Sequence, residues 1–260
     1  MLEESVRGQN HESLARQLRQ RTTAKLGRYS GATSVVAAER LEEELSTVRK
    51  LGYESYFLAV ADIADITRSK GIRVAARGSG AGSLICYLLG ISGVEPISQG
   101  LLMERFCSPL RNELPDIDID VESHRRLEIY DAIFERFGPE RTATVAMVET
   151  YRARHAIRDV GAALGISQME IDLIAKSLPH IRARNIGKAL QNLPELQGLK
   201  LDTPMMKAAI QLAGKLDGLP RHLSMHPCAV LLSDNRLFDI APTEINASGY
   251  PMVQLSLIHI

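Results

Sequence analysis

Hydrophobic positions along the chain recur at helical spacing in some segments and alternate with polar positions in others. In residues 38–52 the apolar side chains of Leu41, Leu45 and Val48 share one face of a helix, and Gly52 follows as a stop signal. Residues 56–63 are mostly apolar, which fits either a buried strand or the start of a helix. Residues 72–76 predict a short strand that leads into a glycine-rich turn, RGSGAGS, and then an apolar helix over residues 84–89.

The second half of the chain also mixes both periods. DIDIDV at 116–121 alternates strictly, which is typical of a strand with one acidic and one apolar face. The remaining predicted elements are an amphipathic helix at 127–137, a buried strand at 142–148, a helix at 151–164 capped by Thr150, short helices to about 216, and a strand at 229–233. This order predicts a mixed α/β (α+β) domain with a helical insertion.

Composition narrows the class of protein. With 45% hydrophobic and 24% charged residues the chain can bury a core, and a formal net charge of zero argues against a uniformly polybasic nucleic-acid binder. The three cysteines are widely separated and form no CxxC pair, so neither a disulfide framework nor a zinc ribbon is indicated. The amino-terminal residues lack the apolar core of a signal peptide, and no apolar run reaches membrane-spanning length, so we expect a cytoplasmic protein.

Asp116 and Asp118 form a candidate metal site. Carboxylates at i and i+2 of a strand point the same way, about 7 Å apart, so they could share two divalent cations. Oxygen ligands alone favour Mg²⁺ or Mn²⁺. An EF-hand loop is excluded, because Val121 stands where that loop needs glycine and Leu127 where it needs glutamate. A solvated edge strand remains an alternative.

The glycine-rich turn is a candidate phosphate site. Backbone N–H groups at a helix start could form an anion cradle, supplemented by the Ser79 hydroxyl and the Arg77 guanidinium. The turn lacks the Gly-Lys-Ser/Thr of a Walker A loop and does not fit GxGxxG. A purely structural turn remains the alternative.

These motifs occur together in one order: YFLAVADI, ARGSGAGSL, ERF, PDIDID, RHAIRDVG and RHLSMHPCAVLLS. In that order they resemble the alpha subunit of bacterial DNA polymerase III, the family C DNA polymerases, over about residues 40–254. The resemblance implies a polymerase-beta-like nucleotidyltransferase palm at 1–148, a helical thumb at 149–218 and a return to the palm at 219–254. It leaves open whether the form is replicative or error-prone; RHLSMHPCAVLL favours an actinobacterial-type or error-prone form.

The resemblance also assigns site residues. Asp116 and Asp118 match the family's metal-binding catalytic aspartates, with two Mg²⁺ or Mn²⁺ ions in the intact enzyme, and Asp120 is a supporting acid. Residues expected to bind the nucleotide triphosphate are Gly78, Ser79, Arg105 and Arg77. The implied partners are primer–template DNA and a deoxynucleoside triphosphate, with a sliding clamp and other replisome subunits bound through regions outside this chain.

Basic residues of the implied thumb are candidates for DNA-phosphate contacts, although a solvated helix face is an equal alternative for each; they are Arg152, Arg154, Arg158, Arg182, Arg184 and Lys188. His222, His226 and Cys228 could in principle ligate zinc. No fourth ligand is evident, and the resemblance places them on a strand returning to the palm. Structural or DNA-proximal roles are therefore favoured.

The resemblance predicts that the family's third catalytic aspartate lies downstream of Gln254. The last six residues, LSLIHI at 255–260, resemble translated adapter sequence rather than the family's continuation. The amino-terminal phosphoesterase-like domain, the fingers and the clamp-binding segment are also outside the chain, so the isolated chain is expected to have little polymerase activity. Two alternatives remain: a related nucleotidyltransferase acting on another substrate, and a DNA-binding module without chemistry.

Overall fold

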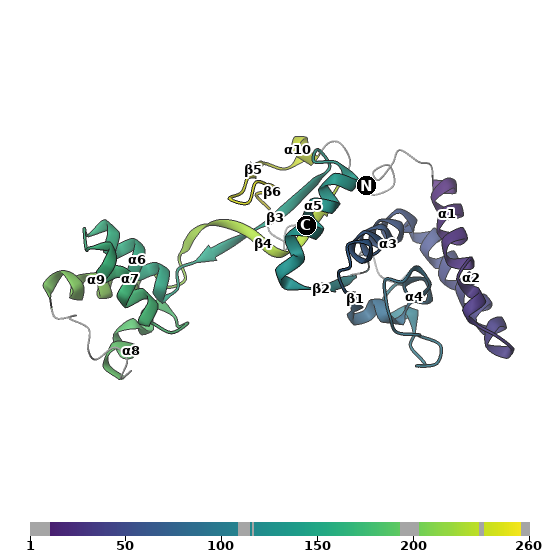
Figure 1. Ribbon diagram of the computed structural model, residues 1–260, viewed down its shortest axis with the longest axis horizontal. Helices are drawn as coiled ribbons and strands as arrows, with labels where there is room; N and C mark the ends of the chain where they lie inside the picture. Colours follow the sequence, from purple (N-terminus) through teal and green to yellow (C-terminus); the bar gives the residue numbers. More distant parts are fainter. Residues whose placement is uncertain (1–10, 109–114, 116, 193–202, 234–236, 256–260) are drawn as a thin grey trace. The chain divides into compact units, whose positions relative to one another are not determined.

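The computed structural model describes residues 11–108, 115, 117–192, 203–233 and 237–255. Helices and strands are mixed along the described chain, which confirms the mixed α/β prediction (Figure 1). The α-helices are α1 His11–Thr23, α2 Ala32–Leu51, α3 Glu54–Ser69, α4 Leu84–Leu89, α5 Arg126–Phe137, α6 Ala153–Ala163, α7 Gln168–Ser177, α8 Ile186–Asn192, α9 Pro204–Lys215 and α10 Leu237–Ile240. The strands are β1 Val74–Arg77, β2 Asp118–Val121, β3 Thr142–Thr150, β4 Pro220–Leu232, β5 Thr243–Ile245 and β6 Pro251–Val253.

The chain forms two compact units. The first unit comprises residues 1–144 and 230–243, and the second unit comprises residues 145–229 and 244–260. Strands β3 and β4 each run from one unit into the other, and the four-stranded sheet has the order β4-β3-β6-β5. Within the described residues, no helix is long and apolar enough to cross a membrane.

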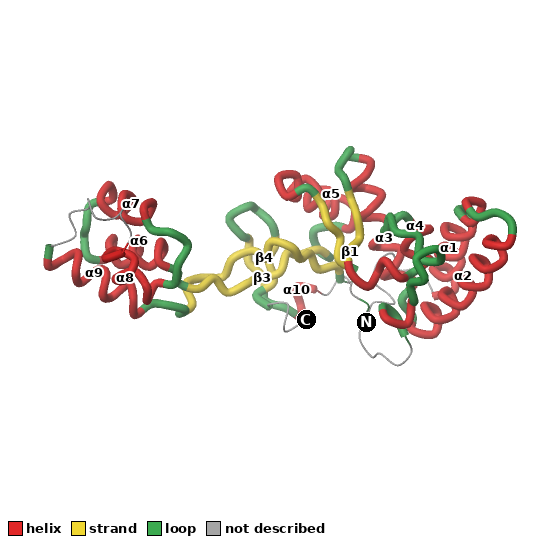
Figure 2. The backbone as a smooth tube through the Cα atoms, turned by 90° about the horizontal axis from the view of Figure 1, so that it is seen from below, coloured by secondary structure: helices red, strands yellow, loops and turns green. Residues whose placement is uncertain are grey.

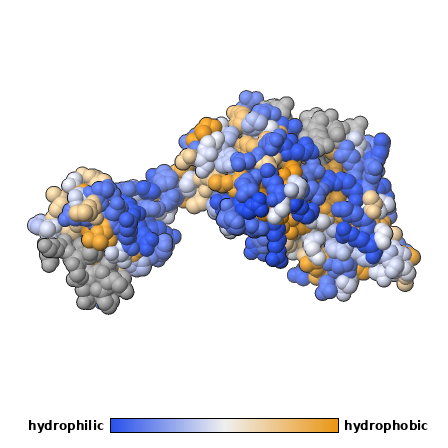
Figure 3. Space-filling model, in the orientation of Figure 1, coloured by the Kyte–Doolittle hydropathy of each residue, from blue (hydrophilic) through white to orange (hydrophobic). Residues whose placement is uncertain are grey.

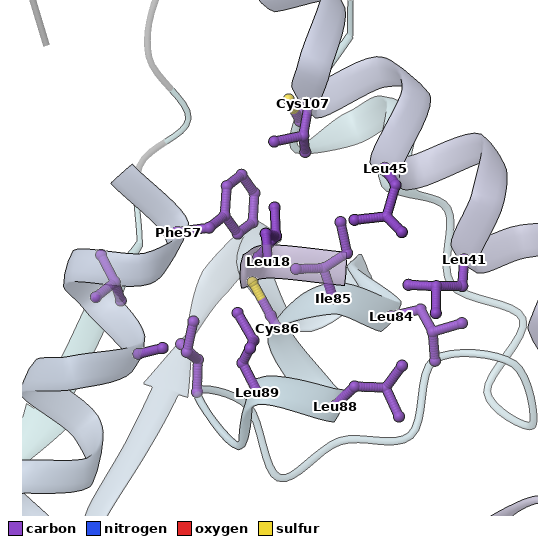
Figure 4. Packing of buried hydrophobic residues seen from close by; sticks show 14 of the residues in the cluster. Leu18, Leu41, Leu45, Phe57, Leu84, Ile85, Cys86, Leu88, Leu89 and Cys107 are labelled. Atoms are coloured by element: carbon purple, nitrogen blue, oxygen red, sulfur yellow. The ribbon is translucent and has the colours of Figure 1, made fainter. Parts of the chain in front are cut away.

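The core of the first unit is built by α1 to α4, which lie together in Figure 1. Helix α2 buries Leu41, Leu45 and Val48, and it ends at Leu51 with Gly52 as its C-cap, whose φ of 71° is left-handed. The predicted helix and its glycine stop are therefore confirmed. Apolar side chains of α4 pack against this face of α2 (Figure 4). Residues 56–63, for which strand and helix were both open, belong to the buried helix α3.

Strands β1 and β2 pair antiparallel in a two-stranded sheet. Arg77 lies opposite Asp118, and Ala76 lies opposite Ile119. Since side chains alternate across a strand, Arg77 and Asp118 share the exposed face, whereas Ala76 and Ile119 pack against the core. The acidic strand thus has the one polar and one apolar face that its sequence predicts.

The helices of the second unit, α6 to α9, form their own cluster (Figure 2). Their core includes Ile157, Ile174 and Leu178, all at most 3% exposed. The predicted cap at Thr150 is wrong, because Thr150 is the last residue of β3 and α6 begins at Ala153. The β-branched threonine continues the strand there, and the N-cap position falls to Arg152, which makes no side-chain cap.

Strand β4 is longer than predicted. The sequence indicated a strand over 229–233, but β4 begins at Pro220 and therefore includes His222, His226 and Cys228. Polar residues at these positions hid the strand from a search for apolar runs.

Candidate functional site

Three motifs that are separated in sequence meet in the first unit around Gly80. A β-carbon added to Gly80 would lie 3.8 Å from Cγ1 of Ile117 and 3.9 Å from Cε2 of Phe106. Ile117 belongs to the DIDID motif and Phe106 to the ERF motif. The glycine turn, defined here as residues 77–83, is therefore the point at which the acidic strand and the ERF segment come together.

The backbone of the glycine turn has a shape that other residues would not adopt freely. Residues Gly78–Gly82 form a 3₁₀ helix directly after β1. Gly78 has a φ of 75°, which is left-handed. At Gly82 a β-carbon would lie 2.7 Å from the carbonyl oxygen of Leu102, just before the 3₁₀ helix Met103–Arg105. Glycine is required here because the turn touches the backbone that carries Arg105.

The acidic strand presents carboxylates on its exposed face. Asp118 and Asp120 are both exposed, and the Arg77 guanidinium donates a hydrogen bond to Asp120 Oδ1. Arg77 thus lies directly opposite Asp118 and reaches diagonally across the two-stranded sheet to Asp120. Asp116, the other predicted catalytic aspartate, lies outside the described residues.

The start of the acidic strand is anchored from α3. The backbone N–H of Ile117 donates a hydrogen bond of 3.2 Å to the hydroxyl of Tyr56. The Ile117 side chain packs against the apolar core. Asp118 therefore follows a residue that is fixed by both its backbone and its side chain.

The predicted phosphate cradle stays a prediction, but the start of α4 takes no part in it. The first backbone N–H groups of α4, at Leu84 and Ile85, already donate to the carboxylate of Glu44, at 2.9 and 3.0 Å. Ser83 caps the helix and also donates to Glu44, at 2.9 Å. An internal anion thus occupies this helix end. Any phosphate site at the motif must use the exposed Gly78–Ser79 part of the turn.

The predicted nucleotide-binding residues are close in the fold. Gly78, Ser79 and Arg77 are consecutive and exposed, and Arg105 is exposed on the 3₁₀ helix that packs against the turn. The sequence brings two arginine side chains and a serine hydroxyl to one region of the first unit. These are donor groups suited to phosphate oxygens.

The donor set of this region fits a hard cation. Its acidic side chains offer oxygen ligands only, whereas Cys86 and Cys107 nearby are buried. Burial raises the pKa of the Cys86 thiol to about 12, which keeps it protonated and inert. Among the described residues no group of three or more histidine, cysteine or acidic side chains is arranged for a metal, but Asp116 is not among them.

The thumb arginines predicted to bind DNA have partners within the second unit. Arg154 Nε donates to the Leu178 carbonyl at 2.7 Å, and Arg158 pairs with Asp172 at 3.3 Å. Asp217 lies 3.9 Å from Arg182 and 3.6 Å from Arg184. Arg152 and Lys188 are exposed. The face of this unit drawn in Figure 3 mixes hydrophilic and hydrophobic residues.

The histidines weighed as zinc ligands contact other groups. His222 Nε2 lies 3.1 Å from Glu149 Oε2, and His155 Nδ1 lies 3.0 Å from the other oxygen of that carboxylate. His226 Nδ1 accepts a hydrogen bond of 3.2 Å from the backbone N–H of Cys228. Glu149 also lines an open hollow of about 350 Å³, which includes Arg152.

Comparison with known proteins decides the family. The profile of the bacterial DNA polymerase III alpha NTPase domain matches residues 12–259. The chain belongs to this family. An error-prone DNA polymerase of Anaeromyxobacter dehalogenans (strain 2CP-C) is 40% identical over 218 residues, which is 84% of this chain and 19% of that protein. The error-prone DNA polymerase of Pseudomonas syringae pv. syringae (strain B728a) is 38% identical over 238 residues, 92% of this chain and 23% of that protein.

The error-prone DNA polymerase of Alkalilimnicola ehrlichii (strain ATCC BAA-1101 / DSM 17681 / MLHE-1) is similar to the same extent, at 40% identity over 84% of this chain and 21% of its own length. This DNA polymerase III alpha family chain therefore spans about a fifth of the length of the curated relatives that it matches.

Two residues near the site had no place in the sequence prediction. Glu44 and Arg40 lie on α2, where Arg40 Nε donates to Glu44 Oε1 at 3.1 Å and Arg40 Nη2 donates to the Gly82 carbonyl at 2.6 Å. A signal was present: Glu44 interrupts the apolar face formed by Leu41, Leu45 and Val48. An acidic residue on a buried helix face needs a partner.

Proposed function

We propose that this chain carries the metal-binding and triphosphate-binding part of the catalytic centre of a template-directed DNA polymerase of the error-prone kind. The observation that carries the proposal is the β1–β2 register, in which Arg77 lies opposite Asp118. This pairing joins the start of the Arg-Gly-Ser motif to an acidic strand that follows it by about forty residues. The names of the similar proteins support the polymerase activity and the error-prone kind.

In the proposed reaction the primer 3′-hydroxyl attacks the α-phosphate of a deoxynucleoside triphosphate and pyrophosphate leaves. Asp116 and Asp118 would hold Mg²⁺ or Mn²⁺, which when bound would acidify the hydroxyl and neutralise charge on the leaving group. The Gly78–Ser79 amides, the Ser79 hydroxyl and Arg105 would orient the phosphates.

Arg77 and Asp120 have a different proposed role. Their ion pair lies on the exposed face beside Asp118. Asp120 would hold the Arg77 guanidinium near the triphosphate rather than bind a cation itself. With Asp120 paired to Arg77, Asp118 is the carboxylate of β2 that would bind the cation.

We also propose that residues 1–148 and 219–254 form a polymerase-beta-like palm and that 149–218 form a thumb on primer–template DNA. The helical character of α6 to α9 and their arginines support the thumb. Clamp and replisome contacts would lie in parts of the longer relatives that this chain does not cover.

A segment exchange tests the proposed activity. Residues of this chain that align with the Anaeromyxobacter error-prone DNA polymerase would replace the corresponding segment of that protein, and primer extension on a DNA template would be measured. We expect template-dependent incorporation. Asp118→Asn should lower its rate by about 10³-fold, because several kcal/mol of charge stabilisation would be lost.

The control is Asp131→Asn, which makes the same change at an exposed position of α5. It should leave the rate unchanged. Untemplated transfer to RNA or to a small molecule would instead indicate a related nucleotidyltransferase. DNA binding with no incorporation in an exchange protein that folds normally would contradict the polymerase assignment.

A further inference from the structure

A buried ion pair on α2 holds the glycine turn from behind. The Glu44 side chain is only 3% exposed and the Arg40 side chain 19%. Arg40 Nη2 binds the Gly82 carbonyl at 2.6 Å, and Glu44 Oε2 accepts from the Ser83 hydroxyl at 2.9 Å. We call these two residues the Arg40–Glu44 brace.

The hydrogen bonds of Glu44 are complete. Oε1 accepts from the Leu84 N–H and from Arg40 Nε, while Oε2 accepts from the Ile85 N–H and from the Ser83 hydroxyl. Four donors thus converge on one carboxylate, which is the full capacity of its lone pairs. A buried charge that is fully paired in this way fixes the groups around it.

The brace acts on both segments that carry proposed triphosphate ligands. It holds Gly82 and Ser83, at the end of the glycine turn. Gly82 in turn lies against the Leu102 carbonyl, where an added β-carbon would come within 2.7 Å. Leu102 precedes the 3₁₀ helix that bears Arg105. A shift of Gly82 would therefore move the turn relative to Arg105.

The apolar surroundings make the brace rigid. Leu41 and Leu45 flank Glu44 on α2, and Leu84 and Ile85 follow the turn on α4; Figure 4 shows these four side chains facing one another. All four are at most 6% exposed. These apolar contacts hold α4 against α2, and the hydrogen bonds of Glu44 fasten the end of the glycine turn to the same helix.

We infer that Arg40 and Glu44 are positioning residues for nucleotide binding: they fix the Gly78–Ser79 amides and the Arg105 segment in the geometry that receives a triphosphate. The inference rests on the proposed function of the turn. It adds that the affinity for the nucleotide depends on two residues of α2 that do not touch the ligand. The affinity for the cation alone does not depend on them.

Glu44→Gln tests the inference. An amide has a single oxygen, so in either orientation its NH₂ group faces a backbone N–H of α4 that then loses its acceptor. Glu43→Gln is the matched control, since Glu43 is the exposed neighbour on the same helix. Both 260-residue variants would first be compared with the wild type by urea unfolding to establish that they are folded.

Two readouts are then combined. Hydrogen exchange measured by mass spectrometry should show backbone amides of residues 78–83 exchanging about tenfold faster in Glu44→Gln, with α3 and α5 unchanged. Titration of dATP in the presence of Mn²⁺ should show about tenfold weaker binding, while Mn²⁺ alone binds within twofold of wild type. Glu43→Gln should match the wild type in both.

The inference is overturned if folded Glu44→Gln binds dATP within twofold of the control, or if exchange rises equally throughout the first unit. A wild-type chain that binds no dATP would contradict the proposed function instead, and unchanged exchange at 78–83 would then overturn the brace independently. If Glu44→Gln does not fold, Arg40→Lys serves in its place, because lysine keeps the charge but cannot reach both Glu44 and Gly82 with fixed geometry.

Discussion

At the scale of single residues, the two exposed carboxylates of β2 differ in their relation to Arg77. Asp120 forms an ion pair with Arg77, whereas Asp118 lies opposite Arg77 in the strand register, at the start of the Arg-Gly-Ser motif. Exposed ion pairs contribute only about 0–1 kcal/mol to stability, so the Arg77–Asp120 pair has more to do with orientation than with folding.

We therefore expect Asp120→Asn and Asp118→Asn to differ in their effect on Mn²⁺ binding. Asp118→Asn should weaken Mn²⁺ binding at least tenfold, because it removes a proposed ligand. Asp120→Asn should change it less than threefold, because Asp120 binds a guanidinium. Electron paramagnetic resonance of free Mn²⁺ measures both. Equal losses in the two variants would make Asp120 a ligand as well.

Glu95 provides a pH-dependent contribution to stability in the first unit. Burial raises the pKa of Glu95, but hydrogen bonds from Ser98, Tyr29 and Ile97 outweigh it and hold the pKa at about 2. Since the folded pKa lies below the unfolded value of about 4.3, the stabilisation is present above that pH and is lost as the pH falls toward 2.

Glu95→Gln should accordingly destabilise the chain by about 1–2 kcal/mol at pH 7, through the loss of charged hydrogen bonds. The difference from wild type should shrink as the pH is lowered from about 4.5 to 3. Urea unfolding followed by circular dichroism at a series of pH values measures it. A difference that is constant over this range would argue against the low pKa of the carboxyl group.

At the scale of elements, local pattern predicted most of the first unit. The apolar stripe of α2, its glycine stop, the Leu84–Leu89 helix and the two-faced acidic strand all depend on neighbours in sequence, and the structure confirms them. The predicted cap at Thr150 and the predicted start of β4 were wrong. Whether a β-branched residue or a polar run adopts strand structure depends on the strands that it pairs with. Strand pairing is not encoded in spacing along one segment.

In the candidate site, too, local motifs could be read from the sequence whereas long-range contacts could not. The motifs that bear exposed donors were visible in the sequence, but the Arg40–Glu44 brace was not, since its contacts span about forty residues. The occupied start of α4 follows from the same contacts. A helix end is open to an external anion only if no internal carboxylate reaches it, and that depends on tertiary packing.

The glycine turn approaches Leu102 closely at Gly82 but not at Gly80. Alanine substitutions at these two glycines of one 3₁₀ helix should therefore differ in their effect on stability. Gly82→Ala should cost about 1–3 kcal/mol of stability, because its β-carbon meets the Leu102 carbonyl oxygen at 2.7 Å. In Gly80→Ala the new methyl lies at ordinary contact distance, 3.8 Å from Ile117, so the change should be below about 0.5 kcal/mol.

Thermal unfolding of both variants measures the difference. The Gly82→Ala protein should also bind dATP–Mn²⁺ more weakly, since relief of the contact moves the turn away from the segment of Arg105. Equal stability of the two variants would contradict the tight approach at Gly82.

At the scale of the whole molecule, a neutral chain can still bind DNA if its basic residues are grouped. The second unit holds the six basic candidates, of which four are exposed: Arg182 and Arg184, which lie beside Asp217, and Arg152 and Lys188. Combined Arg152→Ala and Lys188→Ala should weaken binding to duplex DNA. The dependence of log affinity on log salt concentration should also fall by about 2 in slope, because each phosphate that a basic side chain neutralises contributes about 0.9.

Lys50→Ala serves as the control, because Lys50 is an exposed lysine of α2 in the first unit. Its binding and salt slope should equal those of the wild type. Fluorescence anisotropy with a labelled primer–template at several salt concentrations measures all three proteins. An unchanged slope in the double variant would remove these two residues from the DNA surface.

The proposed function requires that the glycine turn and the acidic strand form one site for a nucleotide and its cations. Calorimetric titration of dATP with and without Mn²⁺ into wild-type, Asp118→Asn and Asp131→Asn chains tests this requirement. We expect Mn²⁺ to increase dATP affinity at least tenfold in the wild type and in Asp131→Asn, and to have little effect in Asp118→Asn. The same increase in all three proteins would show that Asp118 does not join the cation to the nucleotide, and the single site would be wrong.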